Sequence, residues 1–176
     1  MKRILSTNEK NLVYNDLCMR TPYYPKLSVP DTHGEEGTDE RVTCVLTDVN
    51  SYTGLIGTDF DDNINVEDIM AYLRPITDIT DEELKEFVES VWTGGELTEI
   101  NREKGTFTVK NFDYDFNEWY DTLWIDGLDR LLYDPIHSIH WLLKHHFDVF
   151  GLIPRGLALP ATRHMYDVKQ FKARWE

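Results

Sequence analysis

Four of the six histidines fall in one short segment of the C-terminal third, as His137, His140, His145 and His146. Imidazole is the side chain best suited to proton transfer near neutral pH, and it is also the commonest metal ligand. The segment ends in His145-His146-Phe147-Asp148, where two imidazoles and a carboxylate stand within four residues. We therefore take His145, His146 and Asp148, here called the histidine corner, as the candidate functional residues.

A second arrangement in the same segment is the pair His137 and His140. Residues three apart lie on one face of a helix, so both imidazoles could reach one metal ion. A zinc or iron site needs further ligands, and the sequence contains no His-Glu-x-x-His spacing to supply them. Histidine near a helix C-terminus is also favoured by the helix dipole alone. We keep the pair as an alternative metal site and expect no cofactor and no metal.

Other catalytic signatures are missing from the sequence. There is no Gly-x-Ser-x-Gly turn, no phosphate-binding Gly-x-x-x-x-Gly-Lys loop and no dinucleotide-binding glycine motif. Carboxylates are too numerous for one acid and base pair to be identified. These observations favour a protein that is not an enzyme.

The histidine segment must be positioned by a helix. Asp134 is a good N-cap and Pro135 occupies the first helical position, where a missing N–H is harmless. Apolar residues at helical spacing then predict one buried stripe: Ile136, Ile139, Leu143 and Phe147. This stripe predicts a core helix, and the histidine corner stands at its C-terminal end.

The remaining pattern predicts an α+β fold. Two capping boxes, Ser6 to Glu9 and Thr80 to Glu83, predict helices over 7–19 and from 80 to the glycines at 94 and 95. Alternating or β-rich stretches predict strands at 23–29, 41–48, 52–58, 105–110 and 119–125, and 66–73 is predicted as a helical turn before Pro75. We expect a single compact domain over 1–176, with three to four helices packed on a small antiparallel or mixed sheet. Residues 166–176 are a possible C-terminal extension.

Composition limits the classes of partner. The chain has 176 residues, 41% of them apolar, and a net charge of −14. Such acidity repels phosphate backbones, so we expect no direct nucleic-acid binding. It is compatible with a basic protein partner or with imitation of DNA by carboxylates. Nothing in the sequence indicates an oligomeric state.

Targeting signals are also missing. No apolar run approaches the roughly 18 residues of a membrane span, and the N-terminus lacks the apolar stretch of a signal peptide. The two cysteines, Cys18 and Cys44, stand in unrelated contexts and are expected to be reduced thiols. We therefore expect a cytoplasmic protein with no membrane partner.

Three blocks of the sequence stand out as a set: Asp16-Leu-Cys-Met-Arg-Thr-Pro-Tyr23, Tyr72-Leu-Arg-Pro-Ile-Thr-Asp-Ile-Thr-Asp-Glu-Glu83, and Ile139-His-Trp-Leu-Leu-Lys-His-His-Phe-Asp148 running on into Gly151-Leu-Ile-Pro-Arg-Gly-Leu-Ala-Leu159. Together they resemble a family of small proteins from gut Bacteroidales and their phages, whose pattern continues to a Met-Tyr pair, here Met165-Tyr166. The resemblance spans nearly the whole chain and implies a phage-associated context rather than an activity. The family pattern has an acid in place of His140, so the resemblance assigns that histidine no metal-binding role.

The functional hypothesis is a non-enzymatic cytoplasmic accessory protein acting through protein contacts, in the phage context a modulator of a host protein. Its expected contact surfaces are the acidic stretches 31–40 and 59–68 and the histidine corner. Two alternatives come from other classes. One is a small metal-dependent hydrolase or nucleotide-binding protein with a histidine and aspartate site at the corner, and the other is an acidic DNA mimic.

Overall fold

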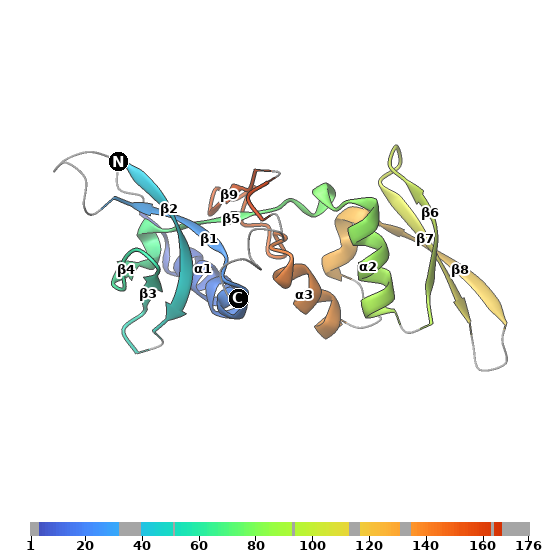
Figure 1. Ribbon diagram of the computed structural model, residues 1–176, viewed down its shortest axis with the longest axis horizontal. Helices are drawn as coiled ribbons and strands as arrows, with labels where there is room; N and C mark the ends of the chain where they lie inside the picture. Colours follow the sequence, from blue (N-terminus) through green and yellow to red (C-terminus); the bar gives the residue numbers. More distant parts are fainter. Residues whose placement is uncertain are drawn as a thin grey trace, which may run out of the picture. The chain divides into compact units, whose positions relative to one another are not determined.

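The computed structural model of the chain describes residues 4–31, 40–50, 52–92, 94–112, 117–130, 135–162 and 164–166. Residue contacts group into two compact units: Met1–Arg74 together with Phe150–Glu176, called unit 1, and Pro75–Val149, called unit 2. The predicted α+β class is confirmed, with three α-helices and two sheets in the described ranges (Figure 1). The single domain over 1–176 is not tested by this grouping and stays a prediction.

Unit 1 is built on a six-stranded mixed sheet with the order β4-β3-β2-β1-β5-β9. The strands are β1 (Lys26–Pro30), β2 (Arg41–Val49), β3 (Leu55–Thr58), β4 (Ile64–Asn65), β5 (Met70–Leu73) and β9 (Ala158–Pro160). All neighbours are antiparallel except β5 and β9, which are parallel with Tyr72 opposite Leu159. The strands predicted at 41–48 and 52–58 are therefore confirmed as β2 and β3, which pair as a hairpin.

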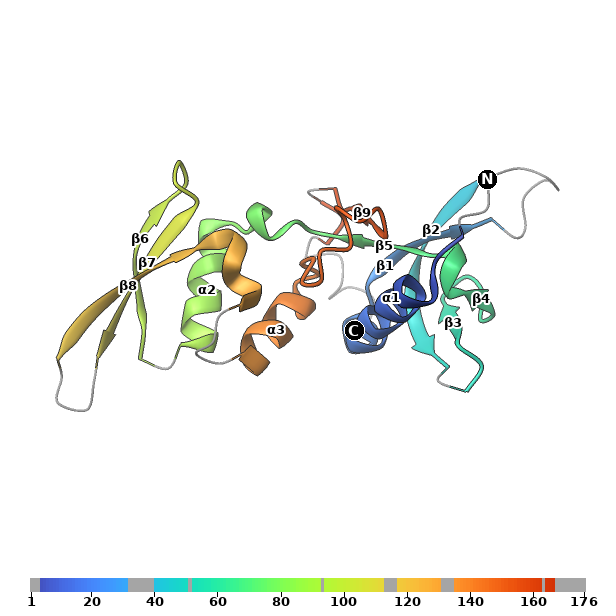
Figure 2. The same ribbon diagram turned by 180° about the vertical axis from the view of Figure 1, so that it is seen from behind.

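The helix of unit 1 is α1 (Thr7–Arg20), followed by the short 3-10 helix η1 (Thr21–Tyr23). It begins at the predicted capping box, in which the Ser6 hydroxyl accepts the Glu9 N–H and the Glu9 carboxylate accepts the Ser6 N–H. Its buried positions recur at helical spacing and include Val13 and Leu17. Seen from its two sides, α1 lies along one face of the sheet (Figure 2).

Unit 2 combines two helices, α2 (Asp81–Val91) and α3 (Pro135–Lys144), with a three-stranded antiparallel sheet. The sheet order is β6-β7-β8, formed by β6 (Glu96–Asn101), β7 (Thr106–Phe112) and β8 (Glu118–Trp124). The short helices η3 (Ile76–Asp78) and η4 (Ile125–Arg130) precede α2 and follow β8. Figures 1 and 2 show α2 between α3 and the sheet, so one sheet face is covered by α2.

The second capping box is also confirmed, because the Thr80 hydroxyl accepts the Glu83 N–H and the Glu83 carboxylate accepts the Thr80 N–H. The helix that it opens buries one apolar face: Leu84, Phe87, Val88 and Val91. The Asp134 N-cap predicted for α3 lies outside the described residues. No helix in the described ranges is long and apolar enough to cross a membrane.

One prediction about an element was wrong, and another was confirmed only in part. The stretch 66–73 is a 3-10 turn, η2 (Val66–Asp68), followed by β5, because its backbone pairs with β1 and β9. In α3 the buried side chains are Ser138, Trp141, Leu142 and Leu143, whereas Ile136 is 73% exposed. Leu143 and Phe147 of the predicted stripe are buried, so the stripe is confirmed toward its C-terminal end, and Trp141 adds a large core side chain that the stripe did not include.

Candidate functional site

The histidine corner is the C-terminal cap of α3. The His146 N–H donates to the Leu143 carbonyl at 3.0 Å, and the Phe147 N–H donates to the Leu142 carbonyl at 2.9 Å. This pair of bonds is the Schellman motif, which requires a left-handed backbone at the first residue beyond the end of the helix. His146 takes that conformation with φ +61°, at a position where glycine is usual.

The side chains of the corner have different surroundings, all within unit 2. His145 stacks on Trp141 with ring centroids 3.8 Å apart, and its Nε2 lies 3.6 Å from a carboxylate oxygen of Glu86 on α2. His146 and Asp148 are buried, at 7% and 8% exposure. Glu86 is a neighbour that the sequence did not indicate, because it lies 59 positions before His145 in the chain.

The alternative metal pair lies on the solvent side of α3. His137 and His140 are both exposed. Among the described residues, no group of three His, Cys, Asp or Glu side chains is arranged to hold a metal ion. The structure thus brings no third ligand to this pair within the ranges it describes.

Of the two acidic stretches expected as contact surfaces, the structure describes 59–68 in full but only the ends of 31–40. Positions 32–39 lie outside the described residues. In the stretch 59–68, two carboxylates accept backbone N–H groups. Asp59 Oδ1 accepts the N–H of Val45 in β2 at 2.7 Å, and Asp61 Oδ1 accepts the Asn63 N–H within its own turn at 3.0 Å. At least these two acidic side chains have a structural role.

Some residues of the blocks that carry the family resemblance make buried polar contacts inside unit 1. Asp16 and Arg20, both at most 1% exposed, form an ion pair in which the Arg20 Nε–H is shared between the two carboxylate oxygens, with Nε–O distances of 2.9 and 2.8 Å. The Tyr166 hydroxyl donates to the Tyr72 carbonyl at 2.6 Å and accepts the Lys26 N–H at 2.8 Å. Burial raises the pKa of Tyr166 above its ordinary value. These contacts give the blocks a structural role.

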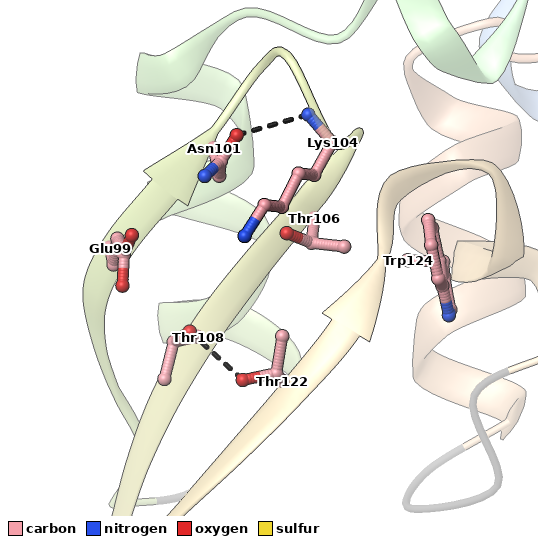
Figure 3. A pocket seen from close by; sticks show the side chains of 7 residues that line it. All are labelled: Glu99, Asn101, Lys104, Thr106, Thr108, Thr122 and Trp124. Carbon is pink, nitrogen blue, oxygen red and sulfur yellow. Dashed lines mark hydrogen bonds between the residues drawn. The ribbon is translucent and has the colours of Figure 1, made fainter.

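A pocket that the sequence did not indicate lies on the face of the β6-β7-β8 sheet, and we call it the sheet pocket (Figure 3). Its volume is about 440 Å³. All three strands and the turn between β6 and β7 contribute to it. Its lining consists of Glu99, Asn101, Lys104, Thr106, Thr108, Thr122 and Trp124.

Large aromatic side chains are exposed at the opposite end of the β7–β8 hairpin. Phe112, Trp119 and Tyr120, which we call the hairpin patch, are 43%, 38% and 57% exposed. Strand alternation puts Phe112 and Tyr120 on the pocket side of the sheet and Trp119 on the other side. Lys110 lies between the two regions, with its ammonium 2.7 Å from the Glu118 carboxylate and 4.9 Å from the centroid of the Phe112 ring.

The negative charge of the chain is concentrated in the same unit. Residues 75–149 contain 17 Asp and Glu against six Lys and Arg, a net charge of −11 out of the total of −14. The uneven distribution of charged residues can be counted in the sequence, but the boundaries of the acidic unit come from the structure. Comparison with family models, with curated proteins and with solved structures finds no match for this chain, so its candidate sites rest on their own geometry.

Proposed function

We propose that the protein is a non-enzymatic cytoplasmic accessory protein that binds a basic protein partner through unit 2. The observation that carries this proposal is the position of the hairpin patch in the part of the chain with a net charge of −11. In the phage-associated context implied by the resemblance, the partner is a host protein whose activity is modulated.

Exposed aromatic side chains support the choice of surface. Phenylalanine, tyrosine and tryptophan are enriched in protein interfaces, where they contribute much of the binding energy when they are desolvated. Phe112 and Tyr120 lie on one face of a regular hairpin, so a partner could cover both with a single surface.

The charge of unit 2 supports the choice of partner. A negative field accelerates the approach of a positively charged protein and opposes the approach of an acidic one. The aromatic side chains would then supply the short-range contacts, while the surrounding carboxylates supply steering. Such an association is expected to slow as salt is added, because salt screens the steering field.

The two alternatives have weaker support. A metal-dependent hydrolase needs three or more protein ligands around its ion, and the described residues hold no such group. A DNA mimic needs a surface of carboxylates, whereas the hairpin patch is aromatic. Both remain predictions from the sequence, and the identity of a captured partner distinguishes them from the proposed function.

Site-specific photo-crosslinking tests the proposal. A photoreactive phenylalanine analogue replaces Tyr120 in the full chain, and the same analogue replaces Tyr52 in a matched control. Tyr52 is an equally large tyrosine, 100% exposed, in unit 1. Crosslinked proteins from the bacterial host are identified by mass spectrometry, and the expected product is one basic protein captured from position 120 but not from position 52.

A second variant removes one aromatic side chain of the hairpin patch and keeps the photoreactive residue at position 120. Phe112→Ser should reduce the yield at position 120 by about tenfold, the loss expected for one aromatic contact at the centre of an interface. Equal capture from positions 52 and 120, or capture unaffected by Phe112→Ser, would contradict the proposal. Capture of a DNA-binding protein that is prevented by duplex DNA added before irradiation would favour the mimic instead.

A further inference from the structure

The sheet pocket offers an unusual combination of groups for a surface of such an acidic unit. Among the described residues, three threonine hydroxyls, one amide, one carboxylate and one ammonium surround one aromatic side chain, and none of Val, Leu, Ile, Met or Ala lines the pocket. The formal charges of Glu99 and Lys104 cancel, so the lining itself is neutral. The volume of about 440 Å³ is in the range of small-molecule sites.

Trp124 supplies the apolar surface of the pocket. It is 62% exposed at the end of β8. Figure 3 shows the indole nearly edge-on beside the pocket, with one flat side turned toward the threonines. An exposed aromatic face attracts an apolar or weakly polarised C–H surface, which gains both burial and contact with the π system.

Hydrogen-bonding groups stand opposite the indole. Asn101 Oδ1 accepts the Lys104 N–H at 3.0 Å, which fixes the amide and leaves its NH₂ group as the donor for a ligand. The hydroxyls of Thr108 and Thr122 lie 3.2 Å apart, and either can be the donor. This pair can therefore offer a ligand an acceptor or a donor as required.

Charge narrows the class of ligand further. The net charge of −11 on unit 2 opposes an anionic ligand such as a nucleotide or a phosphorylated compound. The Lys104 ammonium offsets the Glu99 carboxylate, so the lining offers a cationic ligand no net charge with which to pair. A purely apolar ligand would leave the hydroxyl, amide and carboxylate groups without partners, which costs binding energy.

We propose that the sheet pocket binds a neutral pyranose sugar, with one C–H face of the ring stacked on Trp124 and its hydroxyl groups bonded to Asn101, Glu99 and the threonines. A pyranose carries both required features, since its ring presents C–H groups on a flat face and hydroxyl groups around the rim. The inference goes beyond the proposed function, because the hairpin patch is at the other end of the hairpin and shares no residue with the pocket.

Ligand-observed NMR on the full purified chain tests the inference. The probes are the methyl glycosides of glucose, galactose, xylose and N-acetylglucosamine, compared with glucose 6-phosphate and glucosamine as charged analogues. At least one neutral glycoside should bind with a Kd of about 0.1–10 mM, the range expected for one stacked ring in an open site. Its affinity should be the same at low and high salt, because the ligand is neutral.

Matched variants locate the site. Trp124→Ala should weaken binding by about tenfold, Trp124→Phe should retain part of the affinity, and Thr108→Val should weaken binding without a change in side-chain shape. Tyr120→Ala is the control, an exposed aromatic residue of the same strand outside the pocket. Because Trp124 and Tyr120 are both more than half exposed, their replacement should leave the amide spectrum of the fold unchanged.

Three results would overturn the inference. One is the failure of every neutral glycoside to bind at concentrations up to about 50 mM. Another is an equal loss of affinity in Trp124→Ala and Tyr120→Ala. The third is preferential binding of glucose 6-phosphate or glucosamine. None of these measurements involves a protein partner, so the sugar site and the proposed function succeed or fail separately.

Discussion

At the scale of single residues, His146 meets two demands that rarely fall on one histidine. Its backbone is left-handed, with φ +61°, and its side chain is only 7% exposed. A non-glycine residue in this region costs about 1–2 kcal/mol relative to a right-handed backbone. Glycine would take this left-handed conformation without strain, so a histidine here indicates that the side chain itself has a role. His146 thus remains the residue of the histidine corner whose side chain most needs an explanation.

Two substitutions at this position separate backbone strain from side-chain packing. His146→Gly and His146→Ala both remove the imidazole, but only alanine retains a Cβ in the left-handed conformation. The glycine variant should therefore be more stable than the alanine variant by about 1 kcal/mol. Urea unfolding monitored by tryptophan fluorescence measures both free energies. If alanine is as stable as glycine, α3 does not end in the left-handed cap.

The residue scale also shows how far sequence reasoning reached at the candidate site. It identified the helix and the corner at its end, because proline and the histidines mark them locally. Its buried stripe is confirmed at Leu143 and Phe147 and wrong at Ile136, since Trp141, Leu142 and Leu143 are consecutive and fit more than one apolar stripe. The sheet pocket was not predictable, because threonine, asparagine and glutamate become a site only when three strands align.

At the scale of elements, local signals predicted local structure. Both capping boxes and the β2–β3 hairpin are confirmed, because each depends on residues close together in the sequence. The strands β5 and β9 were missed, and they pair with each other in parallel across more than 80 positions of sequence. Alanine, leucine and methionine in these strands favour helix by propensity, so the pairing is a tertiary effect.

Tyr166 connects the neighbouring strands β1 and β5 and provides a test of their pairing. Its hydroxyl bonds to Lys26 in β1 and lies 2.6 Å from the carbonyl of Tyr72 in β5. Tyr166→Phe should lower the free energy of unfolding by about 1–2 kcal/mol, because it leaves a backbone N–H and a carbonyl with fewer partners. Urea titration at neutral pH measures this loss, and Tyr52→Phe is the matched control at a fully exposed site.

Tyr166 should also make the stability of the folded chain depend on pH in the alkaline range. Burial raises the pKa of Tyr166 in the folded state above the ordinary value near 10. The unfolded chain therefore releases this proton first, and the contribution to stability is complete below pH 10 and decreases as pH rises toward the folded pKa. The stability of the natural chain should fall more steeply above about pH 10 than that of Tyr166→Phe. Parallel slopes for the two proteins would show that the hydroxyl is not buried.

At the scale of the whole molecule, the unit that is continuous in sequence is also the unit that carries most of the negative charge. Unit 2 is one continuous stretch, Pro75–Val149, and it has a net charge of −11, which leaves −3 for the two stretches of unit 1. Unit 2 also has its own buried residues, which include Phe87, Phe107 and Leu142. A continuous stretch with its own core is the kind of segment that can fold when expressed alone.

The fragment 75–149 should fold cooperatively, with a melting temperature that rises as salt is added. Eleven excess negative charges repel one another within a small unit, and added salt screens that repulsion. Relief of about 1 kcal/mol would raise the melting temperature of a domain this small by about 4–8 °C. Circular dichroism in low and high sodium chloride measures the shift. Glu103→Gln, at an exposed position outside the helices, should raise the low-salt melting temperature and reduce the salt response. A fragment without a cooperative transition would instead show that unit 2 requires the rest of the chain to fold.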